Sequence, residues 1–483
     1  MKHLIYQLLP RLWGNGHFSG IDTDTLRYLK DTLGMDWLWC TGVIRHATRW
    51  GEHPQHVVKG DAGSPYAITD YYDVNPYLAD DPSARMEEFR SLVDRVHAAG
   101  LRLIIDFVPN HVAREYSGAC TPKGRRPLGE GDDRSVHWAP ENDFYYYPGE
   151  PLRLPVPSGG YEENPARASG NVFSPAPGVN DWYETVKLNY CDFHTATWDK
   201  MRDIVLFWAG MGVDGFRCDM VELVPPSFMT WLIASVKKDY PSLCFIAEVY
   251  EKEKYRLYAD EVGFDLLYDK SGLYDTLRAV CCNGASARDI TASWQSVGNL
   301  QPRMLHFLEN HDEQRVASDF FCRKPEAAYA ALAVSLLLND ASFMLYFGQE
   351  CGERGMQAEG FSGRDGRTSI FDWCQVPALK KPDKNVLARY SDLLFWSKNP
   401  AFARGKSYDL CYCQDGNFNP DRHFAFARAE GHTAYLVVAN FGKTQDITLR
   451  IPPEALDYLG IKAVRTVYTE EVKENDYALI HIQ

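Results

Sequence analysis

The stretch VDGFRCD at residues 213–219 combines a short apolar strand pattern with two charged side chains at its end. Residues two apart on a strand share a face, so Arg217 and Asp219 should project in the same direction from the end of this segment. An ordinary surface ion pair would explain the pattern equally well, because such pairs are common and contribute little to stability. The remainder of the chain decides between these two interpretations.

A helix-like segment precedes this strand, and the same alternation of strand and helix recurs along most of the chain. Residues 86–100 and 197–212 place apolar side chains at helical spacing, and residues 326–340 are apolar nearly all round. Strand candidates separate these helices, and several are the near-continuous apolar runs of strands buried on both faces. The eight candidates are residues 4–13, 36–43, 101–108, 213–219, 244–250, 264–269, 304–312 and 342–350. Eight repeats predict an α/β fold, the (β/α)8 or TIM barrel of parallel strands.

Two segments interrupt the alternation and predict additional domains. Residues 111–185 are rich in Pro, Gly, Asn and Tyr without a long helical period, which indicates an insertion after the third strand. Residues 400–483 contain runs that alternate in polarity at period two, which predicts a small antiparallel β-sandwich. The predicted division is therefore a catalytic barrel over 1–110 and 186–399, an inserted domain over 111–185 and a C-terminal β-sandwich over 400–483.

Composition excludes several classes of partner. The net charge of -14 and the absence of a polybasic block argue against nucleic acid and against membrane surfaces. The apolar runs are shorter than a membrane span, and the first residues lack the pattern of a signal peptide. Twelve cysteines without CxxC spacing form neither a zinc ligand set nor a disulfide framework, and they favour a cytoplasmic location. The oligomeric state stays open.

Acidic residues stand at or near the carboxyl ends of four predicted strands: Asp106, Asp219, Glu248 and Asp312. The active sites of such barrels lie at this end, and Arg217 would lie one pleat below Asp219. Like charges gathered at one barrel mouth repel each other, so the arrangement does not serve stability. It suits acid/base chemistry on a polar substrate or, alternatively, a cage for a hard metal ion.

Four motifs in chain order resemble the signature regions of the α-amylase family of glycoside hydrolases: DFVPNH (106–111), GFRCD (215–219), IAEV (246–249) and ENHD (309–312). YAITDYYDVNP (66–76) and YFGQE (346–350) resemble that family's flanking motifs. The likeness spans roughly residues 1–400, and the insertion resembles the family's B domain. One such motif would be weak evidence, whereas four in order on the expected strands are specific.

The resemblance implies a role for each matching residue. Asp219 matches the nucleophile, Glu248 the general acid/base, and Asp312 the third carboxylate, which binds sugar hydroxyls and favours an oxocarbenium-like ring. The other matches are Arg217, which would keep Asp219 ionised, His111 and His311, which would bind hydroxyls of the sugar at the cleaved bond, Tyr66, which would stack on that sugar, and Asp106, which would support the site from behind. Each residue alone could be a cap, turn or core residue, and only the joint arrangement favours a function.

The chemistry of retaining glycoside cleavage agrees with these roles. It needs an ionised carboxylate and a protonated carboxyl about 5–5.5 Å apart. Arg217 is expected to lower the pKa of Asp219, and the apolar residues before Glu248 favour its protonated form. These features predict a retaining hydrolase that cleaves α-glucosidic bonds of maltodextrin, starch-type or short α-gluco-oligosaccharides through a covalent glycosyl-enzyme intermediate.

Two other classes of function remain open. A transglycosylase or isomerase of the same family, such as a glucanotransferase or a trehalose-forming enzyme, shares the covalent intermediate and differs in the acceptor. A non-catalytic carbohydrate-binding or scaffold member would be expected to lack one of the three carboxylates, and this chain has all three.

The chain departs from the family pattern after the nucleophile. Many members have Lys and His three and four residues later, where this chain has Glu222 and Leu223. The change affects the contacts on the leaving-group side and the family's structural calcium site, to which that His contributes a carbonyl. Asn110 matches the family's calcium-ligand asparagine, but residues 111–185 show no tight spacing of acidic ligands. We therefore expect no cofactor and no essential calcium, with Asn110 as the candidate ligand if a calcium binds.

Overall fold

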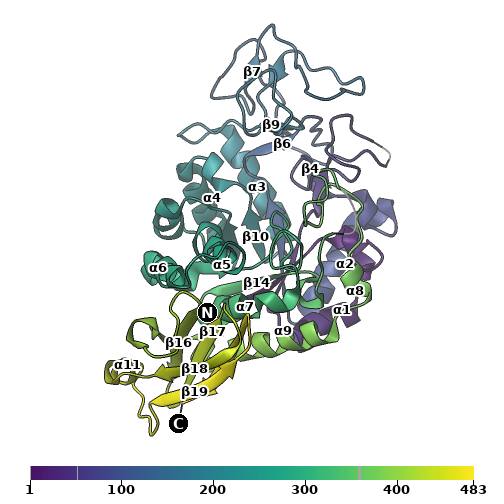
Figure 1. The fold of residues 1–483 in the computed structure, drawn as a ribbon. Coiled ribbons are helices and arrows are strands. Elements are labelled where there is room, and N and C mark those ends of the chain that lie inside the picture. Colours follow the sequence, from purple (N-terminus) through teal and green to yellow (C-terminus); the bar gives the residue numbers. More distant parts are fainter. Residues whose placement is uncertain (1, 52, 357–359, 483) are drawn as a thin grey trace.

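Eight parallel strands close into a barrel in the computed structural model, which describes residues 2–51, 53–356 and 360–482 (Figure 1). In chain order they are β1 (Leu4–Leu8), β2 (Trp37–Cys40), β5 (Arg102–Phe107), β10 (Gly215–Cys218), β11 (Cys244–Ala247), β12 (Leu266–Tyr268), β13 (Met304–His306) and β14 (Ser342–Tyr346). Each lies within one of the eight predicted segments, and neighbours pair in parallel around the closed ring. The predicted TIM barrel is confirmed.

Helices surround the barrel because their apolar faces pack against strands that are already buried. Helix α2 (Arg85–Ala98) buries Phe89, Leu92, Val93 and Val96, the residues at helical spacing. All nine residues of α7 (Tyr329–Leu337) are buried, since this helix lies between β14 and the C-terminal sheet. Among the described residues, the other α-helices of five or more residues are α1 (Thr23–Arg27), α3 (Ala196–Gly210), α4 (Pro226–Asp239), α5 (Asp275–Cys282), α6 (Arg288–Val297), α9 (Lys384–Ser397) and α11 (Pro453–Leu459). No helix among the described residues is long and apolar enough to span a bilayer.

The insertion after β5 lies beyond the carboxyl ends of the barrel strands, at the top of Figure 1. Strands β6 (His111–Ala113) and β9 (Thr185–Lys187) pair antiparallel at its base, and β7 (Tyr146–Tyr147) pairs with β8 (Ala166–Arg167) farther out. The rest of residues 111–185 is loop. A second excursion, the antiparallel pair β3 (Ile44–His46) and β4 (Ile68–Val74), was not predicted and contacts β6.

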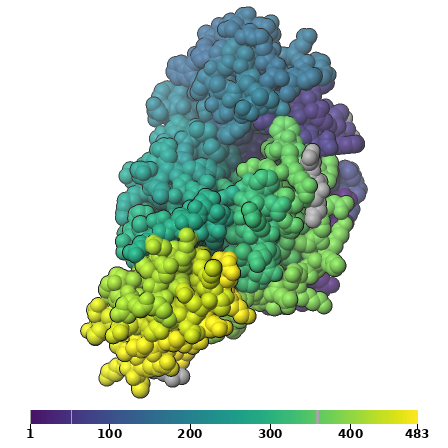
Figure 2. Space-filling view, in the orientation of Figure 1, coloured from purple at the N-terminus to yellow at the C-terminus, as the bar shows by residue number. Residues whose placement is uncertain are grey.

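The C-terminal region is an antiparallel β domain at the opposite end of the molecule from the insertion (Figure 2). Its larger sheet has the order β15 (Lys406–Asp409), β16 (His423–Glu430), β17 (Thr433–Asn440) and β20 (Asp476–His481). A two-stranded sheet of β18 (Gln445–Arg450) and β19 (Val467–Val472) packs on it across a separate apolar core. The predicted antiparallel C-terminal domain is therefore confirmed.

Candidate active site

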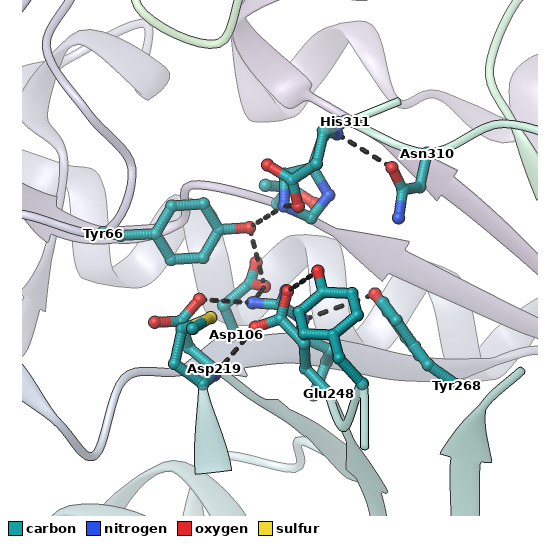
Figure 3. Close-up of polar contacts among 12 residues, drawn as sticks. Tyr66, Asp106, Asp219, Glu248, Tyr268, Asn310 and His311 are labelled. Carbon is teal, nitrogen blue, oxygen red and sulfur yellow. Dashed lines mark hydrogen bonds and ion pairs between the residues drawn. The ribbon is translucent and has the colours of Figure 1, made fainter. Parts of the chain in front are cut away.

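Arg217 is buried and contacts several acidic side chains at the carboxyl end of the barrel strands. Three of these, Asp106, Asp219 and Glu248, are labelled in Figure 3. Its Nη1 donates a hydrogen bond to Asp219 Oδ1 at 2.7 Å and lies 3.7 Å from Asp106 Oδ1. Its Nη2 lies 2.7 Å from Glu248 Oε1, an ion pair without the direction of a hydrogen bond. Arg217 is fully buried, so the alternative of a surface ion pair is wrong.

The register of the barrel explains this convergence. Arg217 is aligned with Asp106 across β5 and with Ile246 across β11, so the ends of three neighbouring strands meet at the guanidinium. Tyr268, at the end of β12, extends the arrangement by accepting a hydrogen bond from Arg217 Nε at 3.3 Å. One positive charge thus faces three carboxyl groups in a water-poor environment.

Glu248 is held through both carboxyl oxygens. Oε2 accepts a hydrogen bond from the backbone N–H of Met220 at 2.7 Å, and Oε1 accepts one from the Tyr250 hydroxyl at 2.7 Å. Met220 adopts a left-handed conformation (φ 44°, ψ 47°), which costs a non-glycine residue about 1–3 kcal/mol and is typical of functional sites. Glu222 accepts hydrogen bonds from the backbone N–H groups of Tyr250 and Glu251 and so fixes the loop that carries the Tyr250 hydroxyl.

His311 connects the floor of the site to its mouth. Its Nε2 lies 2.6 Å from the Tyr66 hydroxyl and 2.9 Å from Asp312 Oδ2, while Gln7 Nε2 contacts its Nδ1 at 2.8 Å. The Tyr66 ring stacks on the His311 ring with a centroid distance of 5.4 Å. The Asp312 side chain is 40% exposed, so this carboxylate stands at the opening rather than on the floor.

These side chains border a cavity of about 230 Å³. The barrel contributes carboxyl groups to its floor, and the insertion contributes Trp182, Glu184 and Thr185 to its wall. The volume is below the range of about 300–1,000 Å³ usual for drug-sized ligands and suits a group the size of one sugar ring. The lining residues used in the arguments below are Lys59, Tyr66, His111, Trp182, Asp219, Glu248, Tyr250 and Asp312.

Burial dominates the electrostatics of the floor. It raises the pKa of Asp219 well above its ordinary value, Glu248 and Asp312 raise it further, and Arg217 only partly opposes them. Arg217 does lower this pKa, as expected, but desolvation among other acids outweighs one guanidinium, so the net shift is upward. Burial also raises the pKa of Asp106, against the opposing effects of Arg217 and His311.

The groups at the mouth and on the wall behave differently. Desolvation alone would raise the pKa of Asp312, but the ion pair with His311 and the positive charge of Arg217 bring it below its ordinary value. Burial, together with the nearby ammonium groups of Lys187 and Lys59, lowers the pKa of His111 to about 3. Asp312 is therefore an anion and His111 a neutral ring at neutral pH.

The structure brings the predicted site residues together, with Asn110 behind the cavity wall beside His111. Tyr66, His111, Asp219, Glu248 and Asp312 line the cavity. The predicted residues Asp106, Arg217 and His311 contact these side chains from behind or beside them. Their roles in a reaction stay predictions at this point.

Several neighbours in the site escaped the sequence analysis. Tyr250 ends the predicted strand 244–250, two residues after Glu248, and Tyr268 is the last residue but one of the predicted strand 264–269, so strand periodicity could have indicated both. Trp182 and Lys59 lie in loops without any period, and nothing in the sequence placed them near the carboxyl groups.

Asn110 is buried beside the cavity, and its side chain is occupied by protein partners. Its Oδ1 accepts a hydrogen bond from Lys187 Nζ at 2.5 Å, and its Nδ2 donates to Gly170 O at 2.9 Å. Lys187 Nζ also donates to Leu223 O at 3.3 Å. No cluster of three or more His, Cys, Asp or Glu side chains within the described ranges could hold a metal ion. Because the Lys187 ammonium already occupies Asn110 Oδ1, this side chain does not present a free oxygen ligand to a calcium ion, and the absence of an essential calcium stays a prediction.

Comparisons with known proteins identify relatives of this chain. Residues 12–371 match the family model described as alpha amylase, catalytic domain. Alpha-amylase MalA of Haloarcula japonica is 27% identical over 457 residues, covering 93% of this chain and 56% of that protein. The alpha-1,4-glucan:maltose-1-phosphate maltosyltransferase of Picrophilus torridus is 27% identical over 271 residues, covering 54% of this chain and 35% of that protein. The chain thus spans 56% and 35% of the lengths of these two relatives.

Solved structures share the fold over the whole chain. The cyclic alpha-maltosyl-(1→6)-maltose hydrolase of Arthrobacter globiformis has a TM-score of 0.70 at 18% identity. The alignment covers 100% of this chain and 99% of that chain. At this level of identity the likeness supports the architecture alone.

Proposed function

Because the chain belongs to the alpha-amylase family, whose catalytic-domain model matches residues 12–371, we propose that it is a retaining glycosidase acting on α-glucosidic bonds. The substrates we propose are maltodextrins or short α-gluco-oligosaccharides. One observation carries the proposal: a single buried guanidinium, Arg217, contacts both Asp219 and Glu248 on the floor of a cavity the size of a sugar ring.

In the first step, Asp219 attacks the anomeric carbon of the sugar held in the cavity. The bond from this carbon to the leaving oxygen breaks, an ester to Asp219 forms, and Glu248 gives its proton to the leaving oxygen. In the second step, Glu248 takes a proton from water, the water oxygen bonds to the anomeric carbon, and the ester to Asp219 breaks. Glu248 is then protonated and Asp219 ionised, as at the start.

Arg217 suits this cycle because it touches both carboxyl groups. Negative charge leaves Asp219 when the ester forms and appears on Glu248 when that residue gives up its proton. The guanidinium therefore keeps one carboxylate partner throughout, without moving. Before the first step the proton must be on Glu248, and a glycosidic oxygen that accepts a hydrogen bond from Glu248 favours this arrangement.

The groups at the mouth suit the binding of sugar hydroxyls. Asp312 is ionised, partly exposed and fixed by His311, so it can accept hydrogen bonds from a sugar ring. The aromatic ring of Trp182 lines the wall and offers a surface for stacking. The small cavity favours action on a terminal sugar or a short oligosaccharide over binding of a long chain. The twelve free cysteines are compatible with a reducing compartment, and we propose that the protein acts in the cytoplasm.

Incubation with maltooligosaccharides, isomaltose, trehalose and sucrose, followed by chromatography of the products, tests the proposal. We expect glucose or shorter maltooligosaccharides to be released. Oligosaccharides longer than the substrate would show that a sugar hydroxyl replaces water as the acceptor, as in a transglycosylase. The Asp219→Asn protein, purified in the same way, controls for contaminating glycosidases. Absence of turnover on all of these sugars would contradict the proposal.

A further inference from the structure

The ammonium group of Lys187 lies at a junction of three chain segments. Lys187 ends strand β9 of the insertion, Asn110 follows β5, and Leu223 lies in the turn after β10. Lys187 Nζ donates to Asn110 Oδ1 at 2.5 Å and to Leu223 O at 3.3 Å. One cationic group thus joins the insertion to the ends of two adjacent barrel strands.

The partners of this ammonium are neutral oxygens. Among the described residues, no ion pair joins Lys187 to a carboxylate. A side-chain amide oxygen and a backbone carbonyl are hard donors of the kind that calcium prefers, but calcium needs six to eight of them. A lysine ammonium is a compact point charge with three N–H donors, so it satisfies a few converging oxygens without further ligands.

The orientation of Asn110 links this junction to the cavity. Because Lys187 donates to its Oδ1, the amide must turn its Nδ2 toward Gly170 O and His111 Nδ1, at 2.9 Å and 3.0 Å. His111 Nδ1 is then the acceptor, and the neutral ring carries its proton on Nε2. His111 lines the cavity, and the Trp182 ring lies 5.1 Å from it. The ammonium therefore determines how one side of the sugar site is built.

We propose that the Lys187 ammonium is a built-in cation that replaces a bound calcium, fastening the insertion to the barrel and positioning His111 through Asn110. Lys187 is a positioning residue and does not touch the substrate. The fastening stands on the contacts alone, whereas the effect on substrate rests on the proposed function.

A second lysine offers a matched control. Lys200, on helix α3, also joins the barrel to the insertion, through Asp143 Oδ2 at 2.5 Å and Pro127 O at 3.3 Å. Neither of these partners is Asn110 or His111. Replacing either lysine by methionine removes a buried or half-buried ammonium from the same interface, but only Lys187→Met releases Asn110.

The first experiment measures thermal unfolding and limited proteolysis with chelator, without additive and with millimolar calcium. The wild-type Tm should be the same in all three conditions. Lys187→Met leaves two oxygens without their donor, so its Tm should fall by about 2–5 °C and cleavage within residues 111–185 should accelerate. The double variant Lys187→Ala, Asn110→Asp exchanges the ammonium for a carboxylate, and calcium should raise its Tm.

Two results would overturn the fastening role. One is a wild-type Tm that falls on chelation and recovers with calcium, because a bound metal ion, and not Lys187, would then join the insertion to the barrel. The other is a Lys187→Met protein with wild-type Tm and wild-type proteolysis.

The second experiment tests the positioning of His111 by steady-state kinetics on a maltooligosaccharide. Lys187→Met should raise KM about tenfold or more, Lys187→Arg should recover part of this loss, and Lys200→Met should keep the wild-type KM. Equal KM values for the two methionine variants would refute the positioning of His111. If the wild-type protein cleaves no sugar, the proposed function fails, while the unfolding and proteolysis results still test the fastening.

Discussion

Replacing Asp219 by asparagine should abolish turnover and at the same time stabilise the protein. Asparagine keeps the shape of the side chain and an oxygen that can accept the hydrogen bond from Arg217, now 2.7 Å long. It cannot form the ester on which the proposed reaction depends. We expect kcat/KM to fall on the order of 10⁴–10⁶-fold, which corresponds to about 5–8 kcal/mol of lost transition-state stabilisation.

The expected gain in stability follows from the charges on the cavity floor. Arg217 contacts three carboxyl groups, those of Asp106, Asp219 and Glu248, so the fully ionised cluster has one cation for three anions. An amide in place of Asp219 removes one of these buried charges. Relief of this kind at an active site typically adds about 0.5–2 kcal/mol to the free energy of unfolding. For a chain of this length, that corresponds to a rise in Tm of about 0.5–2 °C.

The Tm difference between Asp219→Asn and the wild type should increase with pH, whereas an effect of packing alone would not depend on pH. Burial raises the folded-state pKa of Asp219 above its ordinary value of 3.8. Well below pH 3.8 the group is protonated in both the folded and the unfolded chain, so the wild type carries no penalty there. As the pH rises through the folded-state pKa, the wild type loses stability relative to the variant. The Tm difference should therefore be smallest at the acid end of the range and grow as the pH rises toward the folded-state pKa of Asp219.

Differential scanning calorimetry across pH 4–7, with kinetics on the same preparations, provides the assay. Wild-type turnover in Asp219→Asn would show that the nucleophile has been misassigned. A variant that is less stable than the wild type at neutral pH, or a Tm difference that does not change with pH, would refute the electrostatic reasoning.

Other predictions follow from the same contacts. Glu248→Gln should turn over natural oligosaccharides slowly but regain much of the rate on α-glucosyl fluoride, whose leaving group needs no proton; equal losses on both substrates would place the acid elsewhere. Tyr250→Phe removes the hydroxyl that donates to Glu248 and should lower kcat about 10–100-fold with little change in KM, so wild-type kinetics would contradict this role. Activity should rise with pH through the raised pKa of Asp219, because the nucleophile must be ionised, and a profile that stays flat down to pH 3.8 would contradict this. Because its pKa is about 3, His111 should produce no change in activity between about pH 5 and 8. A change of activity in this range whose midpoint moves in the Asn110→Ala variant would contradict the neutral state of His111.

The barrel was predictable because its strands follow a simple physical rule. A strand buried on both faces is apolar along nearly its whole length, and β2 and β14 are fully buried runs of this kind. The parallel direction of these strands located the candidate site, because it brings all their carboxyl ends to one edge of the barrel. Asp106, Asp219 and Glu248 could thus be placed near one another without knowledge of any loop.

The features that escaped prediction depend on loops or on the extent of burial. Lys187 meets Asn110 only because the insertion returns to the barrel at β9, and no periodicity in residues 111–185 indicates this return. The left-handed Met220 follows from the packing of its turn and has no signal in the sequence. The lowering effect of Arg217 on the pKa of Asp219 was predictable because the arginine is visible in the sequence, whereas the burial that outweighs it is not.

The anomeric configuration of the first-formed sugar tests the central claim most directly. Proton NMR of a maltooligosaccharide digest, recorded in the first minutes before mutarotation, distinguishes the two anomers of the product. A covalent intermediate on Asp219 inverts the anomeric centre twice, so the account predicts the α-anomer as the initial product. The β-anomer as the initial product would contradict it.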